Sequence, residues 1–146
     1  MFARCLSGVL GSSLKAVPSV VLAEFHMMMR RSLRLVLDAE DSIEVVAEST
    51  DVPSAVRDVH RLRPDVLVLD LRLPGGSSLN AIRHLREQVP ATQVVAATMQ
   101  DGAAYAKRAL EAGATGFVLT DMADADLIPA VLRAGRGERF ESPAPV

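Results

Sequence analysis

The stretch Pro64-Asp65-Val66-Leu67-Val68-Leu69-Asp70-Leu71-Arg72-Leu73-Pro74-Gly75-Gly76 decides the fold. Four aliphatic residues in a row, Val66 to Leu69, leave no polar side, which is typical of a strand that is covered on both faces of a parallel sheet. The strand ends on Asp70, and the proline and glycines that follow turn the chain. Ligands of open parallel sheets bind beyond the carboxyl ends of the strands, so Asp70 is a candidate site residue. The alternative is an aspartate that only caps or solubilises a loop.

Composition excludes several classes of protein. The chain has 146 residues, of which 49% are apolar and 23% charged, as expected for one soluble globular domain. A net charge of −2 gives no overall field for recruiting nucleic acid. The single cysteine, Cys5, leaves no disulfide framework and favours the cytoplasm. No apolar run is long enough for a membrane span, and serines and a lysine interrupt the apolar residues of a candidate signal peptide near the N-terminus.

Strands and helices are predicted to alternate on both sides of this stretch. Hydrophobic periodicity predicts strands at 20–23, 43–47, 66–69, 93–97 and 116–119, and helices at 27–38, 79–88, 103–112 and 124–134. Another helix, with Pro53 in its first turn and an apolar stripe from Ala55 to Leu62, is predicted between the second and third strands. Thr50 or Asp51 is expected to cap the second helix, Ser77 or Ser78 the third and Asp101 the fourth. Pro129 should bend the last helix. The pattern predicts an α/β fold with one five-stranded parallel sheet and helices on both faces. Residues 1–18 are an N-terminal extension, 19–137 the domain, and 138–146 the start of a linker or tail.

Polar residues follow four of these strands. Glu24, Asp70, Thr98 and Thr120 each stand at a carboxyl end. Neighbouring strands lie about 4.8 Å apart, so we expect these four side chains to share one pocket. The three histidines, His26, His60 and His84, fall on separate elements, so no zinc site is predicted.

Three segments resemble the receiver domains of bacterial response regulators, in particular those of the NarL/FixJ type. These are Arg63–Gly75, Arg108–Phe117 and Gly137–Pro143, and they occur in the family's order. The resemblance implies the flavodoxin-like strand order 2-1-3-4-5. It also implies a module of two-component (phosphorelay) signal transduction rather than an enzyme.

The family's site residues transfer position by position. Asp70 corresponds to the phosphoacceptor, Thr98 to the hydroxyl that meets the phosphoryl group, and Phe117 to the aromatic that changes rotamer on activation. The resemblance implies a magnesium site formed by Glu24, Asp70 and the backbone carbonyl of Arg72.

Two positions depart from the family's pattern. Receivers carry an acidic pair after the first strand, whereas this chain has Glu24-Phe25, and Phe25 offers no oxygen ligand to magnesium. Thr120 replaces the lysine that follows the fifth strand, so a positive charge is missing where phosphoryl transfer needs one. Arg72 or His26 could substitute, although solvent exposure of Arg72 and helix capping by His26 are the favoured alternative. We therefore expect weak Mg²⁺ binding and impaired phosphorylation of Asp70.

The sequence leaves two main functional hypotheses. In the first, the chain is an atypical cytoplasmic receiver that acts through protein contacts. In the second, it is an ordinary phosphoacceptor and the regulatory half of a helix-turn-helix transcription regulator. Expected partners are a histidine kinase and a second receiver, with no direct nucleic-acid or membrane binding by this chain. The dimer interface is expected either at the surface of helix 103–112, strand 116–119 and the last helix, or between the first and last helices.

Overall fold

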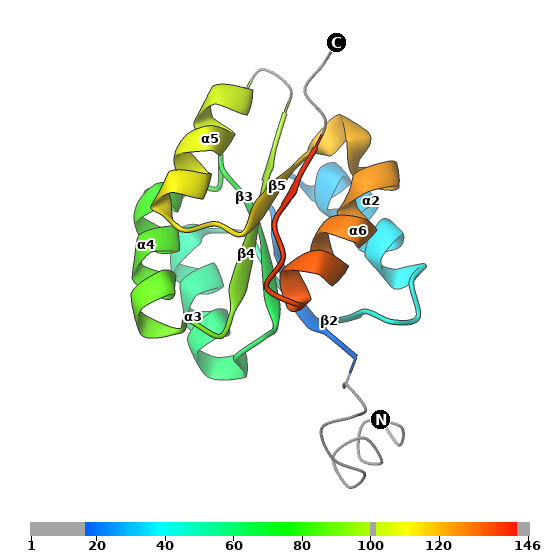
Figure 1. The fold of residues 1–146 in the computed structure, drawn as a ribbon, viewed down its shortest axis with the longest axis horizontal. Helices are drawn as coiled ribbons and strands as arrows, with labels where there is room; N and C mark the ends of the chain where they lie inside the picture. The colour runs from blue at the N-terminus through cyan, green and yellow to red at the C-terminus, as the bar shows by residue number, and fades with distance from the viewer. Residues whose placement is uncertain (1–16, 100–101, 143–146) are drawn as a thin grey trace, which may run out of the picture.

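The computed structural model describes residues 17–99 and 102–142, which form a parallel sheet between two layers of helices (Figure 1). The strands are β1 (Ser19–Ala23), β2 (Glu44–Ser49), β3 (Val66–Asp70), β4 (Gln93–Thr98), β5 (Gly116–Leu119) and β6 (Phe140–Glu141). The helices are α2 (Met27–Asp38), α3 (Val52–Leu62), α4 (Ser78–Gln88), α5 (Ala103–Ala112), the 3₁₀ turn η2 (Thr120–Met122) and α6 (Ala123–Gly135). Helices α3, α4 and α5 cover one face, and α2 and α6 cover the other.

The sheet confirms the predicted parallel α/β architecture but has six strands rather than five. Its order is β2-β1-β3-β4-β5-β6, and every pair is parallel. The prediction missed β6 because only two residues pair, within a proline-containing segment whose composition is typical of a linker. These residues gain strand geometry from the open edge of β5 rather than from their own periodicity.

The strand β3 lies in the middle of the sheet, as its unbroken apolar run indicates. Val66, Leu67, Val68 and Leu69 are all 0% exposed, and their side chains alternate between the two helical layers. Strand β2 lies at the edge, in agreement with its alternating pattern, although it begins and ends later than predicted. This core fixes the position of Asp70 at the carboxyl end of β3.

The structure decides between the alternative capping residues at two of the predicted helices. The Asp51 side chain accepts a hydrogen bond from the backbone N–H of Ser54 (2.8 Å), and the Ser77 hydroxyl accepts one from that of Asn80 (3.1 Å). Asp101 lies outside the described residues, and the expected bend at Pro129 stays a prediction. In the part of the chain that the structure describes, no helix combines the length and hydropathy needed to cross a membrane.

Candidate functional site

A cavity of ≈ 390 Å³ lies at the carboxyl edge of the sheet, where β1, β3, β4 and β5 end. We call it the carboxyl-edge cavity. Its lining residues come from the ends of these strands and the first turn of α2: Glu24, Phe25, His26, Met29, Asp70, Arg72, Met99 and Thr120.

The cavity brings together three of the four predicted strand-end residues. Glu24, Asp70 and Thr120 all line it, whereas Thr98 does not. Thr98 is buried at 2% exposure, and its hydroxyl lies where a side chain on Gly102 would stand. Thr98 is therefore at the predicted edge of the sheet but is packed against the start of α5. Its predicted contact with a phosphoryl group stays a prediction, as does the rotamer change of Phe117.

Asp70 is held by the turn that follows its strand. Its Oδ1 accepts a hydrogen bond from the backbone N–H of Arg72 (2.9 Å), and its carbonyl accepts one from Leu73 (3.1 Å). This turn leaves Asp70 partly exposed on the cavity wall. An aspartate in this position has both a fixed backbone and an accessible carboxylate.

Glu24 is the buried carboxyl group of the cavity, at 4% exposure. Burial, together with the nearby Asp70 carboxylate, raises the pKa of Glu24 from its usual 4.5 to about 7. The backbone N–H of His26 donates to Glu24 Oε2 (3.0 Å) and opposes this effect, as does Arg30. Near neutral pH, the Glu24 carboxyl group is therefore only partly ionised.

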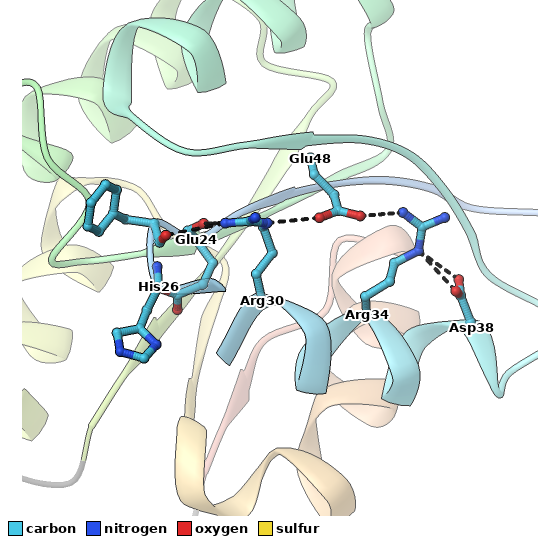
Figure 2. Close-up of polar contacts among 7 residues, drawn as sticks. Glu24, His26, Arg30, Arg34, Asp38 and Glu48 are labelled. Atoms are coloured by element: carbon cyan, nitrogen blue, oxygen red, sulfur yellow. Dashed lines mark hydrogen bonds and ion pairs between the residues drawn. The ribbon is translucent and has the colours of Figure 1, made fainter. Parts of the chain in front are cut away.

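The loop between β1 and α2 is fixed by an arginine of the first helix. Arg30 Nη1 donates to the carbonyl oxygens of Glu24 (3.1 Å) and Phe25 (3.2 Å), and its Nε pairs with Glu48 of β2 (3.0 Å). Figure 2 shows this arrangement and its continuation through Arg34 to Asp38. Helix α2 thus fixes the chain at Glu24, and two of its arginines, Arg30 and Arg34, make specific ion pairs.

The two candidate substitute cations, Arg72 and His26, are both exposed and both lie at the cavity. His26 occupies the N-cap position of α2 but makes no side-chain cap hydrogen bond, and both His26 and Arg72 line the cavity. Arg72 Nη1 lies 3.7 Å from Met99 Sδ, and the Arg72 side chain is exposed to solvent, as expected.

The residues present do not fit the magnesium site that the resemblance implies. Phe25 supplies an exposed ring (61%) in place of a second acid, and Met29 and Met99 make much of the wall apolar. Glu24 readily holds a proton, which competes with a metal ion for its oxygens. In residues 17–99 and 102–142 there is no cluster of three or more histidine, cysteine or acidic residues that could hold a metal.

Sequence reasoning missed one polar pair outside the cavity. His60 of α3 and His84 of α4 lie with their Nε2 atoms 2.9 Å apart, although they belong to separate elements. Each falls on the side of its helix that faces the other helix. Such a pairing depends on how α3 and α4 pack together, and the sequence pattern alone does not define that packing.

Comparisons with known proteins identify a family and relatives of similar sequence. Residues 20–132 match the model of the response regulator receiver domain family. The oxygen regulatory protein NreC of Staphylococcus epidermidis is 36% identical over 122 residues, which are 83% of this chain and 56% of that protein. The chain thus spans little more than half the length of this curated relative.

Solved structures show the same similarity. A LuxR-family two-component response regulator from Aurantimonas sp. SI85-9A1 superposes with a TM-score of 0.79 at 32% identity, covering 88% of this chain and 91% of the other. The response regulator ChrA of a heme-sensing two-component system superposes with a TM-score of 0.76, also at 32% identity, covering 89% and 62% of the two chains.

Proposed function

This chain belongs to the response regulator receiver family, and on that basis we propose that it is an atypical receiver in which phosphorylation of Asp70 is impaired. In this proposal it transmits signals through protein–protein contacts of its receiver surface. It acts in the cytoplasm, and a histidine kinase and a second receiver are its proposed partners. The observation that carries the proposal is the composition of the carboxyl-edge cavity.

The cavity places an acceptor carboxylate next to groups that do little to stabilise a phosphoryl group. Phosphoryl transfer is catalysed mainly by positioning and by cations that offset negative charge on the transferred oxygens. Here Phe25 removes an oxygen ligand for a metal ion, and Thr120 carries no charge. Arg72 lines the same cavity and supplies one guanidinium, which can pair with phosphate but does not replace a metal and a lysine together.

A second candidate function is favoured by the relatives. Those proteins include a LuxR-family response regulator and NreC. The match to this chain covers 56% of NreC. In this alternative the chain is an ordinary phosphoacceptor and the regulatory half of a helix-turn-helix transcription regulator. Asp70 would then accept a phosphoryl group despite Phe25 and Thr120, with Arg72 as the compensating cation.

Phosphorylation with a small-molecule donor separates the two functions. Wild-type protein and the double variant Phe25→Asp with Thr120→Lys are incubated with radiolabelled acetyl phosphate and Mg²⁺. We expect labelling of the double variant to be about a hundredfold faster or more, because each change restores electrostatic stabilisation that is typically worth that much. The single variants should gain less, because both groups act on the same phosphoryl oxygens and are coupled.

Two controls make the result specific. Phe25→Leu removes the ring without adding an oxygen ligand and should not increase labelling. Adding Asp70→Asn to the double variant must abolish the signal. If wild-type protein is labelled as fast as the double variant, phosphorylation is not impaired and the second candidate function replaces the first.

A further inference from the structure

Two histidines meet between neighbouring helices, away from the carboxyl-edge cavity. His60 lies in the last turn of α3 and His84 in α4, and these two helices cover the same face of the sheet (Figure 1). Their Nε2 atoms are 2.9 Å apart, and the ring centres are 5.2 Å apart. The two rings therefore meet at their edges through these nitrogens rather than stacking face to face.

The contact between the rings is a hydrogen bond at the protein surface. One Nε2 carries a proton and the other offers its lone pair, so the second lone pair of the donor ring is at Nδ1. His84 is exposed and His60 is half-buried, so water competes for both rings. A hydrogen bond of this kind stabilises the folded chain only modestly. A stronger binder of imidazole nitrogen can therefore displace the shared proton.

The separation of the two nitrogens matches that of two imidazole ligands on one metal ion. Imidazole nitrogens bind divalent transition metals at about 2.0–2.1 Å. At that bond length, two nitrogens 2.9 Å apart subtend an angle of about 90° at the metal. Tetrahedral coordination would need a separation of about 3.3 Å. The pair thus fits adjacent positions of a tetragonal ion, the geometry that Cu²⁺ and Ni²⁺ prefer.

The two helices hold the histidines without help from a flexible loop. Val59, next to His60, and Leu85, next to His84, are both 0% exposed and belong to the same apolar core. The backbone is thus fixed at both positions, and only the side chains must turn for their lone pairs to converge on one ion. Ligands held on rigid elements lose little conformational entropy when they bind.

We propose that His60 and His84 form a two-histidine site for a divalent transition-metal ion, with Cu²⁺ bound more tightly than Ni²⁺ or Zn²⁺. On binding, the donor ring moves its proton from Nε2 to Nδ1, and both Nε2 lone pairs then ligate the ion. Two neutral rings release no proton in this exchange. Water completes the coordination, since no third histidine, cysteine or acidic residue joins the pair among the described residues. The bound ion joins α3 to α4 and does not depend on Asp70.

The test is copper binding by the full-length chain. Every protein carries Cys5→Ser, so that the single thiol can neither bind nor reduce the metal. Cu²⁺ alone is titrated into the protein, and the backbone amide signals are followed by NMR because this paramagnetic ion broadens the signals nearest to it. We expect selective broadening around His60 and His84 and an electron paramagnetic resonance spectrum of tetragonal Cu²⁺ with nitrogen ligands. Equimolar Zn²⁺ should leave the broadening in place.

Tight binding should require both rings. His60→Gln and His84→Gln should each bind Cu²⁺ about a hundredfold more weakly, because the second ligand of a linked pair binds intramolecularly. His84 is exposed, so His84→Gln removes a ligand without disturbing the fold. The matched control is His26→Gln, which removes a histidine at the start of α2 and should leave the affinity unchanged. Cu²⁺ should also raise the urea midpoint of the Cys5→Ser protein more than that of either glutamine variant of the pair.

Three outcomes would overturn the proposal. The first is a Cu²⁺ affinity of the Cys5→Ser protein that is no higher than that of His84→Gln. The second is an absence of broadening in α3 and α4 at saturating Cu²⁺. The third is displacement of Cu²⁺ by equimolar Zn²⁺, which would contradict the tetragonal geometry inferred from the nitrogen separation.

Discussion

Replacing Glu24 by glutamine should remove a pH-dependent penalty on folding. The pKa of Glu24 is about 7 in the folded chain and 4.5 as an ordinary glutamate, and each pKa unit corresponds to about 1.36 kcal/mol. The folded state therefore holds a proton that the unfolded state releases between these two pH values. Stability from this group is fully present below pH 4.5 and falls as the pH rises to about 7. The loss amounts to about 3 kcal/mol and is complete above the folded pKa.

Glutamine keeps the size and the hydrogen-bond acceptor of Glu24 but carries no charge. We expect Glu24→Gln to be up to about 3 kcal/mol more stable than wild type at pH 8, with the advantage shrinking toward pH 4.5. Urea unfolding of both proteins across this range gives the free energies. The matched control is Glu87→Gln, which neutralises an exposed carboxylate on α4 and should change stability little at any pH. A glutamine variant that is no more stable at pH 8 would refute the reasoning about burial and Asp70.

Three other variants test the framework around the site. Asp51→Ala should lower the urea midpoint because the Ser54 N–H loses its cap, while Asp51→Asn should retain most of the stability. Equal loss in both variants would contradict capping. Arg30→Gln should accelerate amide exchange at His26, because the two carbonyls of the β1–α2 loop lose their shared donor; unchanged exchange would show that the loop is rigid without it. Leu67→Ala should cost about 2–5 kcal/mol by urea unfolding, since its side chain is 0% exposed. A loss similar to that of a surface substitution would contradict central burial of β3.

Sequence patterns predicted the strands and helices whose apolar residues follow an unbroken run or a regular spacing. The apolar run of Val66–Leu69 specified a central strand because burial on both faces leaves no polar side. The helix Met27–Asp38 has the predicted bounds because its apolar spacing is regular. The position of Asp70 at a carboxyl edge followed from that strand alone.

Features that depend on packing between distant elements were not predictable in the same way. Strand β6 exists because Gly116 admits the backbone of Phe140, a contact between residues 24 positions apart that no local pattern reports. Thr98 has the expected residue type and strand end, yet its hydroxyl faces Gly102 and not the cavity. The raised pKa of Glu24 likewise results from its burial and from the nearby Asp70, which only the assembled sheet defines.

The clamp formed by Arg30 has a consequence for molecular recognition at the carboxyl-edge cavity. A ligand that binds to a flexible loop must order that loop, and the loss of conformational entropy reduces the binding affinity. Here the carbonyls of Glu24 and Phe25 are already held by one guanidinium, which is itself anchored to Glu48 on the neighbouring strand. The conformational entropy of this β1–α2 loop was therefore already lost when the chain folded. A ligand of the cavity therefore encounters a preorganised β1–α2 loop, so ordering of this loop does not reduce its affinity.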